Sequence, residues 1–346
     1  MRFKTVYTEI TNKCNLNCRT CYNRSGLNKT TREISVAEIE YILKTCSEYG
    51  ANRFLFSGGE PSLHSHFHEL LALIDGYPKF SYGFVTNGTV HDEAWIDFLN
   101  SHDNITLQIS LDGASEETNK LTRGCGNFDR ALEFIKKLRL PSQKPLLKMV
   151  VSKNNLHDVE NYYRFAVTLG CIPEFAFIYR SGNGADEWEK KALSPQQKLS
   201  VLRTVRKLNE EYSIEAYLPM CTVRCPFSSG NDTISVCIKT NGMIQPCQTL
   251  YSDEYSIGNI FKLNEKEMQI RVDSLISTAK QRLLTNYGCE KCLLRSGCGK
   301  GCMAEAVNNF GNPLADDGNC LLRKLQFLEI YAKEQTDGSL RKDERK

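Results

Sequence analysis

The sequence predicts an α/β fold, in which a partial, TIM-like (β/α)6 barrel of parallel strands is followed by a small cysteine-rich domain. Two observations predict it. In the first half of the chain, short β-branched or aromatic runs alternate about six times with amphipathic stretches, the pattern of strand–helix units around a parallel sheet. In the second half, nine of the fifteen cysteines lie between Cys221 and Cys320, among short strands and turns.

The predicted strands are apolar enough to be covered on both faces, as the strands of a parallel sheet are. They are Val6–Ile10, Phe54–Ser57, Tyr82–Thr86, Ile105–Leu111, Leu147–Val151 and Glu174–Tyr179. The carboxyl ends of such strands form one rim, where the active sites of these folds lie. Motifs that follow the strands are therefore expected to meet at that rim.

Amphipathic helices are predicted by apolar residues at helical spacing. They cover residues 35–49, 128–138, 159–169, 194–212 and 266–285. Ser35 with Glu38, and Ser194 with Pro195, are start signals for two of them. The segment Ser181–Ser194 is rich in glycine, asparagine and charge, and we interpret it as a boundary.

Length and composition set the domain organisation. The 346 residues are enough for a large domain over 1–215, a smaller one over 216–335 and a charged tail over 336–346. A net charge of +3 gives no bias toward nucleic acid. There is no signal segment and no run of 18 apolar residues, so neither export nor membrane spanning is indicated and a cytoplasmic location is expected.

The cysteines indicate metal or iron–sulfur sites rather than disulfides, because the chain is long, lacks a signal segment and carries an odd number of them. Cys14, Cys18 and Cys21 follow the first strand with the spacing C-x3-C-x2-C. Three thiolates leave one iron of a [4Fe–4S] cluster open, and the amine and carboxylate of a small molecule can fill that position. The alternative for this loop is half of a zinc site.

This loop resembles the signature of the radical S-adenosylmethionine (SAM) superfamily, and the resemblance continues after the next strands. Ser57-Gly58-Gly59-Glu60-Pro61 looks like the GGE motif, whose glycines let the backbone approach the methionine amine. Thr86-Asn87-Gly88 and Ser110-Leu111-Asp112-Gly113 stand where the family contacts the cofactor. Arg123 follows a loop that in relatives helps to bind the carboxylate.

The resemblance implies SAM and a [4Fe–4S] cluster as cofactors, with a 5′-deoxyadenosyl radical that removes hydrogen from the substrate. Backbone near Phe177–Tyr179 would face the adenine. Thr20 is a departure, since relatives often carry an aromatic residue there, although Tyr22 follows. That departure weakens the packing of adenine but not the ligation of the cluster. The implied SAM contacts are Tyr22, Ser57, Gly58, Gly59, Glu60, Pro61, Thr86, Asn87, Ser110, Asp112 and Arg123.

The second half carries Cys289-x2-Cys292-x5-Cys298-x3-Cys302, and Cys320 follows after seventeen residues. Together with the upstream cysteines, this layout closely resembles the SPASM domain of radical enzymes that act on peptides and proteins, which holds two further [4Fe–4S] clusters. The alternative is a pair of structural zinc knuckles. The resemblance implies that auxiliary cluster I is held by Cys225, Cys247 and Cys302, with Cys221 or Cys237 as the fourth ligand, and auxiliary cluster II by Cys289, Cys292, Cys298 and Cys320.

Three further cysteines match no ligand spacing. Cys46, Cys125 and Cys171 are expected to be small, buried apolar residues.

Relatives with this two-domain layout include sulfatase-maturing enzymes and ribosomal-peptide maturases. Sulfatase maturases carry an aspartate base directly after the cysteine that matches Cys247, but this chain has Gln248, which cannot accept that proton. Asp253 or Glu254 could substitute for it. We expect a peptide or protein substrate, modified by thioether or carbon–carbon crosslinking, epimerisation or side-chain oxidation, and a reductant such as flavodoxin or ferredoxin.

Two alternatives stay open. One is a radical SAM enzyme that acts on a small biosynthetic molecule. The other, of a different class, is a non-catalytic iron–sulfur electron carrier or a zinc scaffold. The GGEP, TNG and SLDG motifs argue against a carrier, because electron transfer does not require a site for SAM.

Overall fold

The computed structural model describes residues 1–26, 31–140, 143–216, 225–229, 233–250, 252–284, 289, 291–294 and 298–329. Cys221 and the predicted tail over 336–346 lie outside these ranges.

The strands of the described residues belong to one sheet, in the order β6-β5-β4-β3-β2-β1-β7-β8-β9. They are β1 (Arg2–Thr11), β2 (Arg53–Gly58), β3 (Ser81–Thr86), β4 (Ile105–Ser110), β5 (Leu146–Val151), β6 (Ile172–Phe177), β7 (Thr233–Ile238), β8 (Met243–Gln245) and β9 (Gly258–Asn259).

The α-helices lie mostly between the strands in chain order. They are α1 (Val36–Glu48), α2 (Phe67–Asp75), α3 (Glu93–Ser101), α4 (Glu116–Arg123), α5 (Asn127–Lys137), α6 (Val159–Thr168), α7 (Asn183–Lys191), α8 (Pro195–Tyr212), α9 (Glu265–Leu284) and α11 (Met303–Phe310). Residues 320–329 form a further helical stretch.

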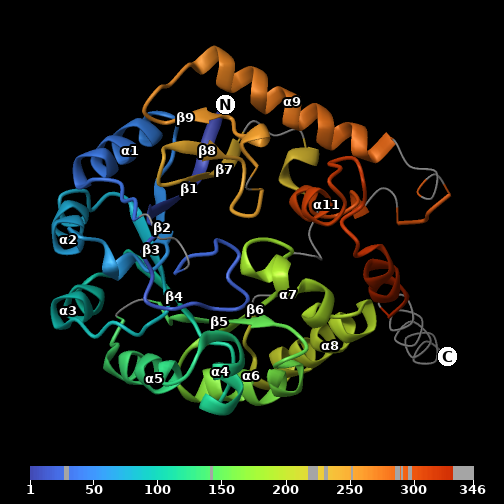
Figure 1. The fold of residues 1–346 in the computed structure, drawn as a ribbon, viewed down its shortest axis with the longest axis horizontal. Coiled ribbons are helices and arrows are strands. Elements are labelled where there is room, and N and C mark those ends of the chain that lie inside the picture. Colours follow the sequence, from blue (N-terminus) through green and yellow to red (C-terminus); the bar gives the residue numbers. More distant parts are fainter. Residues whose placement is uncertain are drawn as a thin grey trace, which may run out of the picture.

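Strands β1 to β6 pair in parallel, each with the next along the chain, and this confirms the predicted α/β barrel fold. Figure 1 shows them as a curved row with α1 to α6 on the outer side. Among the described residues β6 and β9 are the edge strands, so the barrel is partial. The sixth strand begins and ends two residues earlier than predicted.

Both predicted helix starts are confirmed. The Ser35 hydroxyl accepts from the amide of Glu38, whose carboxylate accepts from the amide of Ser35. Ser194 forms the same capping box with Gln197, and Pro195 stands at the first position of α8. These side chains satisfy amide groups that a helix start leaves without partners.

The segment that we interpreted as a boundary, Ser181–Ser194, contains α7, and the sheet continues beyond it. Strand β7 pairs in parallel with β1, with Tyr7 opposite Cys237. Strands β8 and β9 then add antiparallel neighbours. The cysteine-rich region therefore extends the barrel's own sheet.

A second contact joins the two regions through buried polar groups. The Lys198 ammonium of α8 donates to the Asn319 side-chain oxygen at 2.6 Å, and the Asn319 amide donates to Glu305 of α11 at 2.8 Å. Burial is the largest influence on Glu305 and raises the pKa of its carboxyl to about 7. Lys198 also lies over the ring of Phe177, the last residue of β6. The end of β6 is thus held between α8 and the cysteine-rich region.

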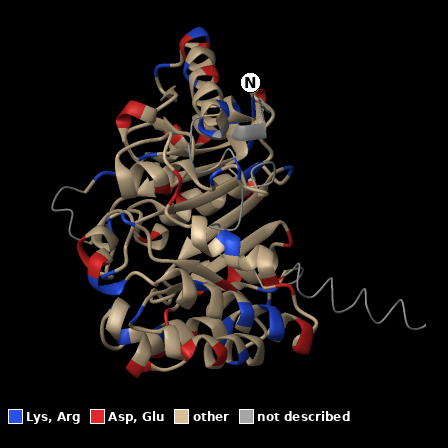
Figure 2. Cartoon of the chain, turned by 90° about the vertical axis from the view of Figure 1, so that its right-hand side faces the viewer, with Lys and Arg blue, Asp and Glu red and all other residues tan. Residues whose placement is uncertain are grey.

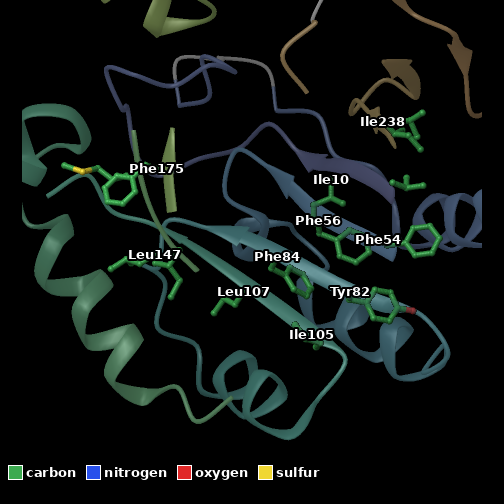
Figure 3. Packing of buried hydrophobic residues seen from close by; sticks show 14 of the residues in the cluster. Ile10, Phe54, Phe56, Tyr82, Phe84, Ile105, Leu107, Leu147, Phe175 and Ile238 are labelled. Atoms are coloured by element: carbon green, nitrogen blue, oxygen red, sulfur yellow. The ribbon is translucent and has the colours of Figure 1, made fainter. Parts of the chain in front are cut away.

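The core fills the space between the strands and the outer helices. Alternate residues of β2 and β3 point into it, including Phe54, Phe56, Tyr82 and Phe84, as Figure 3 shows. Trp95 of α3 is fully buried there. The opposite face of β4 and β5 is half-buried and polar, with Gln108, Ser110 and Lys148.

Charges of both signs are scattered over the elements in Figure 2. Among the described residues no helix is both long and apolar enough to cross a membrane.

We predict that Trp95→Ala lowers the free energy of unfolding by about 3–5 kcal/mol, because large-to-small changes in a packed core leave a cavity. The Trp95 ring contacts Phe84 and Phe67, with centroids 4.7 and 5.0 Å away. Urea unfolding followed by circular dichroism measures the loss. Phe310→Ala is the control, since its ring is 57% exposed, and should cost less than about 0.5 kcal/mol. Equal losses would contradict the packing described here.

Candidate active site and cysteine clusters

The loop after β1 brings the thiols of Cys14, Cys18 and Cys21 close enough to interact electrostatically. All three side chains are half-buried. Burial raises the pKa of the Cys14 thiol to about 12 and that of Cys18 to about 11. Thiolates at this site therefore need a compensating cation, and a cluster that binds here would displace protons.

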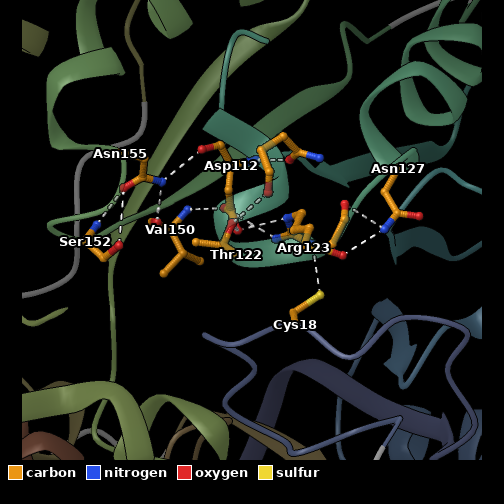
Figure 4. Close-up of polar contacts among 10 residues, drawn as sticks. Cys18, Asp112, Thr122, Arg123, Asn127, Val150, Ser152 and Asn155 are labelled. Atoms are coloured by element: carbon orange, nitrogen blue, oxygen red, sulfur yellow. Dashed lines mark hydrogen bonds and ion pairs between the residues drawn. The ribbon is translucent and has the colours of Figure 1, made fainter. Parts of the chain in front are cut away.

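Hydrogen-bond donors point at two of these sulfur atoms. The amide of Leu16 lies 3.5 Å from Cys14 Sγ, and the Arg123 guanidinium lies 3.9 Å from Cys18 Sγ (Figure 4). Donors to sulfur stabilise cluster-bound thiolates. The set of three thiols on one loop, with donors beside them, fits the three-cysteine cluster that the sequence predicts.

Asp112 fixes Arg123 in this position. The carboxylate is fully buried at the end of β4 and contacts Arg123 Nε at 2.9 Å. It also accepts hydrogen bonds from the Thr122 hydroxyl and the Val150 amide. Burial disfavours the charged guanidinium, but Asp112 and the Cys18 thiol outweigh it and raise the pKa of Arg123. Asn155, which also holds the Asp112 carbonyl, was not singled out from the sequence.

The two glycines of the GGEP turn let it pack directly on the start of the cysteine loop. A Cβ atom on Gly58 would lie 2.0 Å from the Thr11 carbonyl oxygen, and one on Gly59 would lie 2.1 Å from that of Lys13. Gly58 also has a φ of 139°, which other residues rarely adopt. The amides of Gly59 and Glu60 donate to the Thr11 and Lys13 carbonyls at 2.7 and 2.8 Å.

Glu60 joins the ends of two strands. One carboxylate oxygen accepts from the Thr86 and Ser62 hydroxyls, both at 2.7 Å, and the other accepts from the amide of Asn87 at 2.7 Å. Burial outweighs these hydrogen bonds and raises the pKa of Glu60. The Asn87 side chain donates in turn to Asn15 of the cysteine loop. The TNG motif after β3 and the cysteine loop are thus parts of one network.

The segment after β6 also holds the cysteine loop, which the sequence analysis missed. The Asn183 amide donates to the Cys21 carbonyl at 2.8 Å, and its side chain donates to the Cys18 carbonyl at 2.9 Å. A Cβ atom on Gly182 would lie 2.4 Å from backbone oxygens of the loop. Its position after the sixth strand was the available signal, since that strand end also reaches the rim.

Tyr22 places a buried hydroxyl directly after the cysteine loop. It interacts with Tyr7 of β1, which also lies beside Ser57. Burial raises the pKa of both phenols. Thr20 is buried as well. Of the other expected contacts, Pro61 is buried and Ser110 is half-buried at the end of β4.

Comparison with known proteins identifies this arrangement. Residues 8–166 match the family model described as the Radical SAM superfamily. These residues form a radical SAM domain. They contain the cysteine loop, the rim motifs and the Asp112–Arg123 pair.

Two relatives align with most of the chain. The mycofactocin maturase MftC of Mycolicibacterium smegmatis is 25% identical over 306 residues, which cover 86% of this chain and 77% of the relative. The Fe-coproporphyrin III synthase of Methanosarcina barkeri is 25% identical over 354 residues, covering 92% of this chain and 88% of the relative. Both alignments extend beyond the radical SAM domain.

Two solved structures share the fold. The structure of anSMEcpe with bound AdoMet has a TM-score of 0.76 at 20% identity and covers 97% of this chain and 99% of its own. Streptococcus suis SuiB bound to S-adenosylmethionine has a TM-score of 0.72 at 17% identity, and the match covers 91% of this chain and 76% of the SuiB chain. The fold of this chain, including its cysteine-rich region, is therefore that of radical SAM enzymes.

Outside the radical SAM domain, the thiols of Cys225, Cys247 and Cys302 interact electrostatically with one another. Burial raises the pKa of both Cys247 and Cys302. This convergence fits the set expected for auxiliary cluster I. Cys237, a candidate fourth ligand, is buried on β7 and interacts with Cys247. The other candidate, Cys221, lies outside the described residues.

The cysteines expected at auxiliary cluster II form two pairs. Cys289 and Cys292 form a turn, with the Cys292 amide donating to the Cys289 carbonyl. Cys298 and Cys320 interact with each other, and Arg323 Nε lies 3.0 Å from Cys298 Sγ. Within the described residues no three Cys, His, Asp or Glu side chains surround a site for a single metal ion.

One of the predictions for the remaining cysteines is wrong. Cys46 and Cys171 are buried as expected, but Cys125 is exposed. It stands between Gly124 and Gly126 in the turn before α5, away from the apolar core that holds the other two.

The carboxylates suggested as substitute bases lie at the surface. Asp253 and Glu254 belong to an exposed 3₁₀ turn, and Asp253 lies 3.7 Å from the Lys239 ammonium. Gln248 is half-buried beside Cys247.

We predict that Gly59→Ala destabilises the site, because its Cβ atom has no room against the Lys13 carbonyl. Overpacking of this kind costs about 1–3 kcal/mol. The measurements are urea unfolding and the iron bound after anaerobic reconstitution, and both should fall. Gly76→Ala is the control, because Gly76 has ordinary helical angles and a Cβ contact at 3.2 Å. If Gly59→Ala binds iron and unfolds as the parent protein does, the close approach is not essential.

Proposed function

We propose that this radical SAM enzyme removes a hydrogen atom from a peptide or protein substrate and so modifies one of its residues. The observation that carries the proposal is the convergence at one rim of the cysteine loop, the GGEP turn and the Asp112–Arg123 pair. When bound, SAM and a [4Fe–4S] cluster supply the 5′-deoxyadenosyl radical that takes this hydrogen. Cys14, Cys18 and Cys21 would hold the cluster.

The contacts around the rim divide the expected SAM residues into two roles. The carboxylate oxygens of Glu60 and Asp112 already bind groups of the chain itself. We therefore assign Glu60 to positioning the rim and Asp112 to positioning Arg123. Arg123 is the cation beside the cluster site and suits the carboxylate of SAM. The remaining candidates, which supply backbone or short side chains to SAM, are Tyr22, Ser57, Gly58, Gly59, Pro61, Thr86, Asn87 and Ser110.

We further propose two auxiliary [4Fe–4S] clusters in a SPASM domain over residues 216–335, after a barrel over 1–215. The thiols of Cys225, Cys247 and Cys302 support the first, and the pairing of Cys298 with Cys320 supports the second. Cys237 or Cys221 would complete the first set. A small electron-transfer protein such as flavodoxin or ferredoxin would deliver the electrons.

A peptide substrate is favoured by the similarity to mycofactocin maturase and by the fold shared with SuiB, which has been solved with its precursor peptide SuiA. The half-buried polar face of the barrel suits such a substrate. Gln108 and Ser110 lie on it, and Lys148 pairs with Glu174 at 2.9 Å. Amide and charged groups of this kind can bind the backbone of an extended peptide.

A small molecule is the second candidate. The alignment with Fe-coproporphyrin III synthase covers more of both chains than the alignment with the maturase does, at equal identity. A tetrapyrrole is therefore the small molecule to test.

We predict about twelve irons per chain after anaerobic reconstitution, falling to about eight when Cys14, Cys18 and Cys21 are all changed to alanine. With dithionite and SAM, the parent protein should release 5′-deoxyadenosine and the triple variant should not. Cys46→Ala, at a buried cysteine outside the clusters, is the control. Zinc in place of iron, or no deoxyadenosine from the parent protein, would overturn the proposed chemistry.

The substrate class can be determined by finding which molecule donates the hydrogen atom that 5′-deoxyadenosine gains. We predict that a deuterated substrate peptide transfers deuterium to 5′-deoxyadenosine, measured by mass spectrometry, because the radical takes hydrogen directly from its substrate. A deuterated tetrapyrrole precursor of Fe-coproporphyrin III is the matched probe for the alternative. Transfer from the tetrapyrrole alone would reject the peptide, and the triple cysteine variant should transfer from neither.

A further inference from the structure

Arg282 is a fully buried arginine whose hydrogen-bond partners, among the described residues, are all neutral carbonyl groups. It lies near the end of α9 and is 1% exposed. Its guanidinium donates to the carbonyls of Gly301, Lys300 and Ala315 at 3.0 to 3.2 Å. Its Nε atom has no hydrogen-bond partner among the described residues.

Two other arginines beside predicted cluster ligands are neutralised by an aspartate. Arg123, beside Cys18, pairs with the buried carboxylate of Asp112. Arg323, beside Cys298, lies 2.8 Å from the buried carboxylate of Asp317. The carboxylate of Asp317 is shared between Arg323 and the Cys302 amide. No such ion pair joins a carboxylate to Arg282 among the described residues.

The charge of Arg282 interacts most strongly with Cys225, then with Asp317 and Cys302. Two of these three groups, Cys225 and Cys302, are predicted ligands of auxiliary cluster I. Burial still dominates and lowers the pKa of the Arg282 guanidinium. Lys300, also buried, interacts most strongly with Cys289, a predicted ligand of auxiliary cluster II, and its charge opposes that of Arg282. A buried cation without an adequate counter-charge is costly, so this region is built to receive a negative charge.

The loop that binds Arg282 runs between the two predicted clusters. Gly299, Lys300 and Gly301 all have positive φ angles, and they connect Cys298 to Cys302. This tight turn directs two consecutive carbonyls at the guanidinium. A Cβ atom on Gly301 would lie 1.9 Å from the Asp317 carboxylate, so the turn requires glycine there. These hydrogen bonds fix Arg282 relative to Cys298 and Cys302, the predicted ligands at the two ends of the turn.

We propose that Arg282 compensates the negative charge of auxiliary cluster I and thereby raises the reduction potential of that cluster. Reduction adds one electron, and a buried cation in surroundings of low dielectric stabilises that extra negative charge. Arg323 does this less, because Asp317 already cancels its charge. Arg282 acts through its field on the ligands and is not a catalytic residue. The inference rests on the proposed auxiliary clusters.

A purely structural role is the competing explanation, since Arg282 also ties α9 to the 298–302 turn. Two variants separate charge from hydrogen bonding. Arg282→Gln keeps an amide donor but removes the charge, and Arg282→Lys keeps the charge but has fewer donors. Arg271→Gln is the matched control, because Arg271 lies on the same helix and its side chain is 44% exposed.

The experiment is an anaerobic redox titration of the reconstituted full-length protein, followed by electron paramagnetic resonance, with iron counted in each variant. We expect Arg282→Gln to keep about twelve irons and to lower the midpoint of one auxiliary cluster. A tenfold decrease in the equilibrium constant for one-electron reduction corresponds to a midpoint lower by about 59 mV. Arg282→Lys should stay near the parent midpoint, and Arg271→Gln should match it.

Unchanged midpoints in an iron-replete Arg282→Gln variant would overturn the proposal. So would an Arg282→Lys variant that shifts as far as Arg282→Gln, because geometry rather than charge would then be responsible. If Arg282→Gln loses iron, the lysine variant alone decides between these results. A parent protein with only about four irons and active SAM cleavage would remove the auxiliary clusters and this inference, but would leave the radical SAM site standing.

Discussion

The close approach of two backbone segments, the Gly58–Gly59 turn and the stretch Thr11–Lys13, is the constraint on which the rest of the site depends. The pairing of β1 with β2 shifts register between Glu9 and Thr11, where Thr11 comes to lie opposite Gly58. The cysteine loop leaves the sheet at this point. Any side chain on the turn would push the loop away from the ends of β2 and β3, and the Glu60 network that joins them could not form.

Charge is distributed differently around the three groups of cysteines. At the barrel rim and beside Cys298, an arginine and a fully buried aspartate form a pair, so the protein presents a dipole to the sulfur atoms. Around Cys225 and Cys302 the charged groups are not paired in this way, because Arg282 interacts with both thiols while Glu305 interacts with Cys302. Each region holds a thiol whose pKa is raised by burial, such as Cys14, Cys302 and Cys320, and that thiol stays protonated until a metal centre replaces the proton.

Local signals in the sequence predicted the barrel well, because each strand and helix start is encoded within a few residues. The capping boxes at Ser35 and Ser194 and the strand runs needed no tertiary information. The convergence of Cys14, Cys18 and Cys21 followed from spacing alone. Long-range contacts were not predicted. The segment Ser181–Ser194 was interpreted as a boundary from its composition, and nothing in that composition indicated that Asn183 would donate to the Cys18 carbonyl.

The hydrogen-bond partners of Glu60 and Asp112 also required the structure. Both stand in motifs that the family resemblance assigned to the cofactor, but spacing does not reveal where a carboxylate finds its donors. The prediction that Cys125 is buried was wrong for a similar reason. Its exposure depends on the turn in which it stands, which its residue type does not reveal. The order of the sheet was likewise hidden, since nothing local indicates that β7 would pair with β1.

That pairing makes the two regions of the chain poor candidates for exchange by recombination. Strand β1 lies in the interior of the sheet, with β2 on one side and β7 on the other. A gene break near residue 215 would strip β7 away and leave the amides and carbonyls of β1 open along one edge, ready to pair with another chain. Because the same strand leads into the cysteine loop, the barrel and the cysteine-rich region are expected to be inherited together.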